Sequence, residues 1–128
     1  MYNVIKSNDD ILYFLEKTNA LHDGYIIGIQ YENNGISQTE NGHSFNPEQT
    51  KLVLKILVTS ICDSIVEIEF ESLLEWQIKD SQCEITDTTV MFDDHNWIIW
   101  SDEPNISIDE VKNGSYAIAR SMKWRIVE

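Results

Sequence analysis

The sequence predicts an α+β domain in which one N-terminal helix packs on a twisted, largely antiparallel sheet of about six to eight strands. Two observations lead to this fold class. Apolar residues recur with a period near four only between residues 7 and 20, and from residue 25 onward they alternate with a period of two. Turn-forming residues then separate the alternating runs at short intervals, as in strands joined by hairpins.

The helix is predicted to begin at Ser7, whose spacing from Asp10 fits a capping box. An acidic first turn also suits the positive end of the helix dipole. Ile11, Phe14 and Leu15 share one face of this helix. We expect that apolar face to lie on the sheet.

The strands follow from the alternation. In the first, Tyr25, Ile27, Ile29 and Tyr31 are expected on one face, with one side of the strand buried. The later runs are Leu52 to Val58, Val66 to Phe70, Leu74 to Ile78, a strand around Ile85 to Phe92, Trp97 to Trp100, a short strand in "NISIDEV" (105–111), and Tyr116 to Ile126. Arg120 interrupts the apolar face of the last run, so a bend or bulge is expected there.

Three connections are predicted from turn residues: 33–35, 93–96 and 113–114. Residues 36–50 are polar and show no period, so they are expected to form a long loop, with a short hairpin as the alternative. No linker divides the chain, so residues 1–128 are expected to form one domain.

The composition indicates the class of protein and the compartment in which we expect it. The hydrophobic content of 42% is that of a globular chain, and no apolar run approaches the ~20 residues that a membrane span needs. The first residues lack the basic and apolar segments of a signal peptide. Cys62 and Cys83 are too few for a disulfide scaffold, so we expect a cytoplasmic protein with two free thiols. The Cys62 thiol is expected to be inert or buried.

The charge is concentrated in one stretch. The net charge is −13, and residues 63–110 hold fourteen acids and one base, Lys79. An acidic surface repels nucleic acid and anionic membranes, so neither is expected as a partner. The alternatives left are a surface that serves solubility alone and a surface that binds a basic protein.

Two clusters could form such an interface. Glu67, Glu69 and Glu71 share one face of a strand, about 7 Å apart, where they are expected to repel one another and give the fold nothing obvious. Trp97 and Trp100 face opposite sides, so one of them could be exposed beside acidic residues. The residues expected to contact the partner are Glu67, Glu69, Glu71, Glu75, Asp93, Asp94, Trp97, Asp102 and Glu103.

Evidence for catalysis is weak. His22-Asp23 is a dipeptide of metal-dependent phosphohydrolases, but the other histidines, His43 and His95, show no ligand spacing. We expect His22 to meet the carbonyls at the end of the helix while Asp23 turns into the strand. No catalytic, cofactor-binding or metal-ligating set is therefore predicted. The alternative is a small-molecule-binding or metal-dependent hydrolytic domain that uses His22 and Asp23.

The order of segments resembles a loose group of small bacterial proteins, several of which are assigned as immunity proteins of polymorphic toxin systems. The segments are "LHDGYIIGIQY", "KLVLKIL", "SIVEIEFESL" and "YAIARSMKWRIVE". His22, Asp23 and Phe70 carry the resemblance most sharply, whereas Gly24 and the insertion at 36–50 depart from the group. The resemblance implies a non-catalytic protein that neutralises a cognate toxin. A third hypothesis is a subunit that oligomerises through an exposed strand edge.

Overall fold

A computed structural model describes residues 1–33, 37–40, 42–44, 49–79, 84–104 and 106–127. Within them, one helix precedes a curled, eight-stranded antiparallel sheet in the order β7-β2-β5-β6-β10-β9-β8, with β1 paired to β10, so the predicted fold class is confirmed. The elements of this body are α1 (Asn8–Thr18), β1 (Asn3–Ile5), β2 (Gly24–Asn33), β5 (Thr50–Val58), β6 (Ser64–Gln77), β7 (Glu84–Ile85), β8 (Thr89–Phe92), β9 (Ile98–Ser101), β10 (Tyr116–Val127), and the 3-10 turns η1 (Asn19–Leu21), η3 (Thr59–Ile61) and η4 (Ile108–Asn113).

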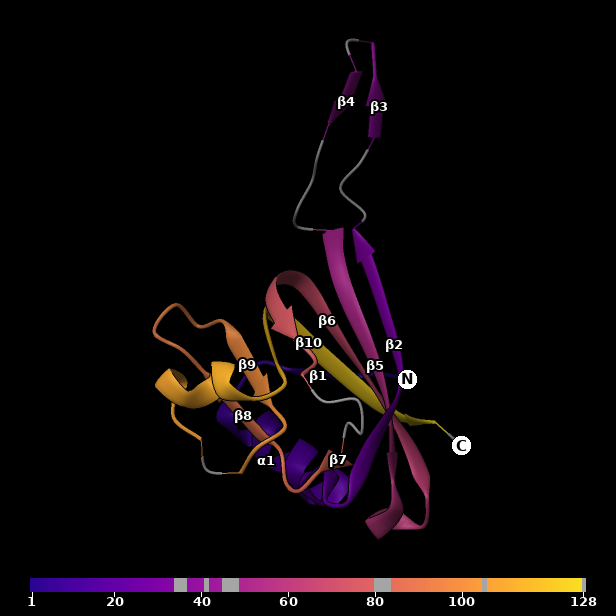
Figure 1. Ribbon diagram of the computed structural model, residues 1–128, viewed down its shortest axis with the longest axis vertical. Coiled ribbons are helices and arrows are strands. Elements are labelled where there is room, and N and C mark those ends of the chain that lie inside the picture. Colours follow the sequence, from indigo (N-terminus) through magenta and orange to yellow (C-terminus); the bar gives the residue numbers. More distant parts are fainter. Residues whose placement is uncertain (34–36, 41, 45–48, 80–83, 105, 128) are drawn as a thin grey trace.

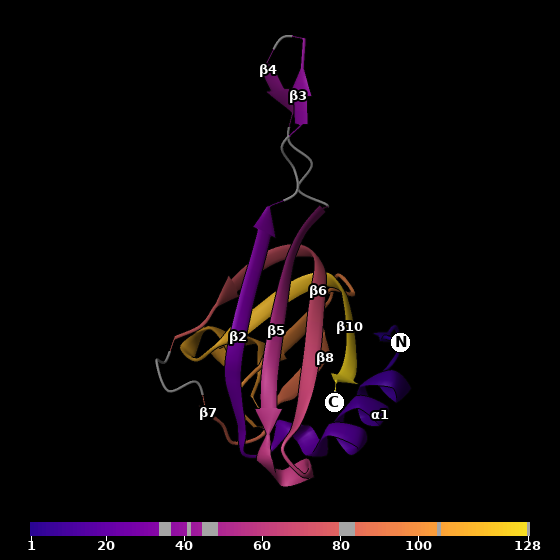
Figure 2. The same ribbon diagram turned by 90° about the vertical axis from the view of Figure 1, so that its right-hand side faces the viewer.

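The sheet curls so that its two ends lie on opposite sides of the core. In Figure 1, β2 and β5 form the right-hand side, β8 and β9 the left-hand side, and the bent strands β6 and β10 join them. Helix α1 lies at the lower end of the curl, as Figure 2 also shows. No helix in the described part of the chain is long and apolar enough to cross a membrane.

The predicted alternation of β5 and β6 produces the core. Every second residue of β5 from Leu52 to Val58, and of β6 from Val66 to Phe70, is buried on the inner face: Leu52, Leu54, Ile56, Val58, Val66, Ile68 and Phe70. The cap of α1 is also confirmed, because the Ser7 hydroxyl accepts a hydrogen bond from the backbone N–H of Asp10 at 3.2 Å. Phe14 of α1 packs edge-on against Trp124 of β10, with ring centroids 5.2 Å apart, which fixes the helix on the inner face.

A bulge in β2 changes the face of its apolar residues. The register with β5 shifts between Ile26 and Gly28, so Tyr25 pairs with Leu57 while Ile29 pairs with Leu54. Leu57 and Leu54 point to opposite faces of β5, so the prediction that Tyr25, Ile27, Ile29 and Tyr31 share one face is wrong. All four side chains are 39 to 54% exposed.

Four further elements differ from the sequence prediction. The runs at 66–70 and 74–78 belong to one strand, β6, whose backbone turns at Ser72 with φ of 52°. The 3-10 turn η4 (Ile108–Asn113) replaces the strand expected in "NISIDEV", because Ser107 and Glu110 make a capping box there. The expected strand around 85–92 is divided into β7 and β8, and β1 was not predicted. The bend or bulge is expected at Arg120, and the structure has a register shift close by, between Ile118 and Ala119.

Part of the expected 36–50 loop is a hairpin. β3 (Ser37–Thr39) and β4 (Gly42–Ser44) pair with each other and extend beyond the ends of β2 and β5 (Figure 1). The short-hairpin alternative therefore holds for these residues. Residues 34–36, 41 and 45–48, which include the predicted Asn34-Gly35 turn, lie outside the described residues, as does Cys83. Cys62 is an exposed free cysteine, so a buried thiol is wrong for this residue.

Candidate partner-binding surfaces

The outer face of the sheet carries an alternating row of acids and bases, which we call the ion-paired face. Central strand β6 contributes the acids, and its two neighbours β5 and β10 contribute the bases. Its members are Glu67, Glu69, Glu71, Lys51, Lys123 and Arg125. The register places Lys51 opposite Glu71 and Arg125 opposite Glu67, so each carboxylate has a base on a neighbouring strand.

Lys123 is the centre of this face. Its ammonium lies 2.9 Å from Glu69 Oε2 and 2.9 Å from Glu71 Oε1, and these hydrogen bonds raise the pKa of Lys123 above its usual value. Lys51 Nζ adds contacts to Glu69 at 3.7 Å and to Glu32 at 3.4 Å. The expectation that these glutamates only repel one another is therefore wrong, because bases lie between them.

Glu67 is the most enclosed of the three glutamates, with a relative exposure of 8%. It accepts a hydrogen bond from the Tyr2 hydroxyl and another from Arg125 Nη2 at 3.1 Å. The Tyr2 hydrogen bond, with Arg125 second, holds the pKa of Glu67 below its usual range, while burial and the same bond raise the pKa of Tyr2. This carboxylate stabilises the fold.

Glu75 is also paired. Lys112 Nζ of η4 lies 3.0 Å from Glu75 Oε2, and the Tyr116 hydroxyl donates to the same oxygen. The Tyr116 bond, followed by Lys112, lowers the pKa of Glu75, and burial together with that bond raises the pKa of Tyr116 to about 12. Glu75 thus fastens η4 to β6.

A second group of acids, which we call the acidic end, behaves differently. It consists of Asp102 and Glu103, which follow β9, and of Asp109 and Glu110 in η4. In the described part of the chain none of these four forms an ion pair with a base. Glu103, Asp109 and Glu110 are exposed. Their charge is therefore available to a partner.

Asp102 stands at the inner side of the acidic end. Its Oδ1 accepts a hydrogen bond from the Ser115 N–H at 3.1 Å, yet burial, assisted by the neighbouring Glu103 charge, raises the pKa of Asp102. An adjoining hollow of about 580 Å³ is lined by Asp102, Glu103, Glu84 and one base, Lys79, among others. Negative charge exceeds positive charge around this hollow.

The other predicted acids lie at the opposite end of β9. Asp93 closes the predicted 93–96 turn, because its carboxylate accepts hydrogen bonds from the N–H groups of His95 at 2.8 Å and Trp97 at 2.9 Å. The rings of His95 and Trp97 stack at 4.6 Å, and Trp97 is half-buried, whereas Asp94 is exposed. Among the predicted residues, Asp93, Asp94 and Trp97 therefore lie at one end of β9, and Asp102 and Glu103 lie at the other. Trp100 is fully buried, and Ile99 on the other face of β9 packs under η4.

His22 joins two loops. Its Nδ1–H donates to the Thr86 carbonyl at 2.7 Å and to Asp87 Oδ1 at 3.0 Å, while Nε2 lies 3.5 Å from Asp23. The Thr86 bond first, then Asp87 and Asp23, raise the pKa of His22. The imidazole thus meets the carbonyl of a distant loop rather than those of the helix end. The hollow beside His22, about 580 Å³, is lined by Asp87 but not by Asp23 or His95.

The sequence prediction did not include Tyr2 or the bases that pair with the glutamates of the ion-paired face. A signal for them was present: Lys51, Lys55, Lys123 and Arg125 alternate with buried residues on strands that could flank the acidic strand. Only the strand order, which the sequence does not show, brings them beside Glu67, Glu69 and Glu71.

The described residues hold no group of three or more His, Cys, Asp or Glu side chains that could bind a metal ion. Comparison with known proteins found no family model, no curated protein and no solved structure that matches this chain.

Proposed function

We propose that the protein is a non-catalytic, cytoplasmic binding protein of the immunity type, which neutralises a basic toxin through the acidic end. The observation that carries this proposal is the contrast in pairing: bases balance the sheet-face glutamates, whereas Glu103 and Asp109 project into solvent without an ion pair to any described base. The resemblance of the segment order to immunity proteins supports the same function.

Charge explains how such a protein would act. Unbalanced acids create a local negative potential that raises the association rate with a basic surface and disfavours acidic competitors. No catalytic group is needed, because occlusion of the toxin suffices. The ion-paired face contributes little to this field, since each of its carboxylates lies within a few ångströms of a cation.

The test begins with the product of the reading frame next to the gene. If that product is toxic when expressed alone, co-expression of this chain should restore growth, and the two purified proteins should form a complex. Failure of both rescue and complex formation with every toxic neighbour would contradict the proposed function.

Two matched double variants then locate the surface. Glu103→Gln/Asp109→Asn and Glu69→Gln/Glu71→Gln each remove two negative charges, and the first leaves the Ser107–Glu110 capping box intact. We expect the first pair to slow association about tenfold at low salt and to reduce its salt dependence, and the second to leave the association rate nearly unchanged. Equal slowing by both pairs would show that net charge, not the acidic end, steers the partner.

A further inference from the structure

One edge of the sheet has no strand beside it over most of its length. β2 is paired with β5 along one side, but on its other side β7 pairs only with Gly24 and Tyr25. Residues 26–33 therefore form an open edge within the part of the chain that the structure describes (Figure 2). Such an edge presents a row of unpaired backbone N–H and C=O groups, and the group that pairs with them is another β-strand.

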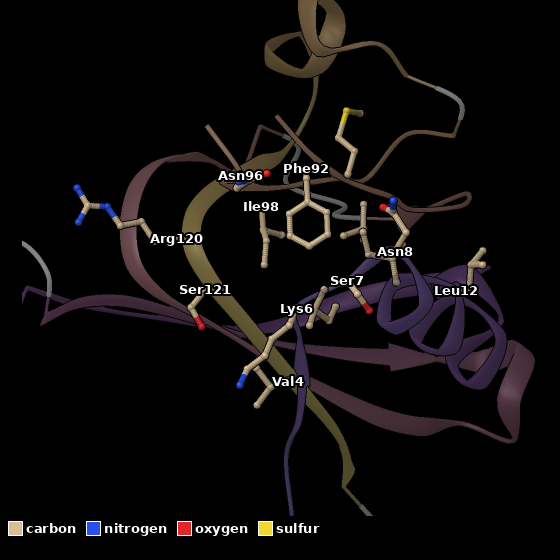
Figure 3. A pocket seen from close by; sticks show the side chains of 14 residues that line it. Val4, Lys6, Ser7, Asn8, Leu12, Phe92, Asn96, Ile98, Arg120 and Ser121 are labelled. Atoms are coloured by element: carbon tan, nitrogen blue, oxygen red, sulfur yellow. The ribbon is translucent and has the colours of Figure 1, made fainter. Parts of the chain in front are cut away.

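The opposite end of the sheet is shorter and lies against the helix. β8 has four residues, and α1 contacts it. The hollow of about 1070 Å³ beside these two elements is lined by Asn8 and Leu12 of the helix and by Phe92 of the strand, among others (Figure 3). Among the strands that the structure describes, β2 therefore has the longest free edge.

The inner face of this edge carries two large apolar side chains that remain exposed. Ile29 and Tyr31 pair with buried leucines of β5, yet they are 46% and 47% exposed. Tyr31 stacks on Trp76 of β6 with ring centroids 5.6 Å apart, which holds its ring on the inner side. A strand added at the edge would cover Ile29 and Tyr31 with its own inner-face side chains.

The outer face of the same edge carries a base at a defined position. Lys55 of β5 lies opposite Gly28, and its Cβ, Cγ and Cδ atoms are 3.5 to 3.8 Å from the place that a Cβ atom would take at Gly28. Lys55 is exposed and forms no ion pair with an acid of the described residues. Glu67 lies opposite Lys55 on β6, but Tyr2 and Arg125 hold that carboxylate. An acid on an added strand, opposite Gly28, would therefore meet the Lys55 ammonium.

We propose that a second copy of this chain occupies the open edge, in a two-fold dimer whose β2 strands pair antiparallel about Gln30. Directly opposed residues share a face, so this register sets Ile29 against the partner's Tyr31, and the symmetry repeats the pair. A β-branched and an aromatic side chain thus cover each other twice. The paired residues, 28–32, lie between the bulge in β2 and the end of that strand, so β7 keeps its own pairing.

The same register also matches the charges. The partner's Glu32 lies opposite Gly28, beside Lys55. Within one chain Glu32 Oε2 already lies 3.4 Å from Lys51 Nζ, so the dimer places this carboxylate between two bases. Glu84 of β7 is an acid at the same edge, but it pairs with Tyr25, outside the residues that join the two copies. Repulsion between two chains of net charge −13 opposes association at long range, and salt screens it.

Sedimentation equilibrium of the full chain tests the dimer. A ladder of this length makes a small interface, so we expect the mass of two chains to be approached only as the concentration rises to about 1 mM, in about 0.3 M salt. A monomer over the whole range would overturn the proposal, and so would growth beyond two chains, because a two-fold pairing is closed. Either result would leave the proposed toxin binding intact, since that function is assigned to the acidic end and needs no dimer.

A charge placed at the edge should prevent the pairing. Ile29→Lys should raise the dissociation constant of the dimer about tenfold or more. Ile126→Lys is the matched control, because Ile126 of β10 is 40% exposed and lies on another strand, and it should change the constant by less than about twofold. Thermal unfolding checks that both variants are folded. Equal effects of the two changes would contradict the proposal.

Two charge reversals test the register. Lys55→Glu and Glu32→Lys each set like charges against each other at both symmetric contacts, so each variant alone should dimerise about fivefold more weakly than wild type. An equal mixture of the two variants places opposite charges at both contacts of a mixed dimer. We therefore expect the mixture to regain wild-type association, with one copy of each variant in the dimer by native mass spectrometry. Two folded variants that do not associate better together than alone would overturn the proposed pairing.

Discussion

The ion-paired face and the acidic end take their carboxylates from the same acidic stretch of sequence, yet they use charge in different ways. On the sheet, Glu67, Glu69 and Glu71 lie between bases of two neighbouring strands. At the acidic end, Glu103 follows the short strand β9 and Asp109 lies in the 3-10 turn η4, where no basic strand lies beside them among the described residues. Position in the fold, not composition, decides whether an acid stabilises the structure or remains available to a partner.

The ion-paired face and the acidic end should also contribute to stability with opposite dependences on pH. The pKa of Glu67 is lowered, so its stabilising contribution is present at neutral pH and is lost as pH falls below about 4.5 and through the lowered folded value. The pKa of Asp102 is raised, so its charge opposes folding at neutral pH. Acidification should therefore destabilise the ion-paired face and remove the unfavourable charge of Asp102 at the acidic end.

The largest expected effect comes from Glu67→Ala. This change leaves Arg125 and the Tyr2 hydroxyl without their shared acceptor, and it should lower the free energy of unfolding by about 2–3 kcal/mol. Urea denaturation at pH 7 measures the loss. Glu103→Ala at the acidic end is the control and should change stability by less than about 0.5 kcal/mol. Similar losses in both variants would remove the distinction between the two regions.

A smaller effect is expected from Glu69→Gln/Glu71→Gln, the pair held by Lys123. Because these ion pairs are only partly enclosed, their removal should cost about 1 kcal/mol. Glu103→Gln/Asp109→Asn should leave stability unchanged or slightly raised, since it removes charge that has no ion-pair partner. Thermal unfolding at low and high salt checks the comparison, and a stabilised Glu69→Gln/Glu71→Gln variant would show that repulsion dominates after all.

The sequence predicts the local part of this fold well. The Ser7 cap, the alternation of β5 and the turn at Asp93 each depend on residues close in the chain, and the structure confirms them. The strand alternation also places Glu67, Glu69 and Glu71 on one outward face correctly. That much of the candidate surface follows from a period of two.

What the sequence did not predict depends on contacts between distant segments. Arg125 is 58 residues from Glu67 along the chain, and Tyr2 is 65 residues away, so no local pattern indicates that they meet. The bulge between Ile26 and Gly28 breaks the alternation at an isolated strand glycine, a local signal that the sequence prediction did not use. The change of partner strand in β10, from β9 to β1 around Arg120, is likewise set by distant segments.

His22 lies between the two cases, because it is a base that titrates and it lies beside the carboxylates of Asp23 and Asp87. The raised pKa means that its stabilising contribution is fully present below the ordinary value of 6.5 and is lost as pH rises through the folded value. Wild-type stability should therefore fall more between pH 6 and pH 9 than that of His22→Gln, by denaturant unfolding at each pH. Asp87→Asn should reduce this dependence only in part, because the Thr86 carbonyl still accepts from Nδ1. An identical pH profile for wild type and His22→Gln would contradict this role.

The smallest expected effect tests the acidic end directly. Asp102→Asn keeps an oxygen that can accept from the Ser115 N–H, but it removes the partly buried charge beside Glu103. Since a raised pKa means that ionisation opposes folding, this variant should be more stable than wild type at pH 7, by at most about 0.5 kcal/mol after solvent screening. The gain should vanish at pH 3, where the aspartate is protonated in both states, and urea denaturation at the two pH values measures it. A loss of stability at pH 7 would show that the Asp102 charge supports the loop that carries it, and the acidic end would then resemble the ion-paired face.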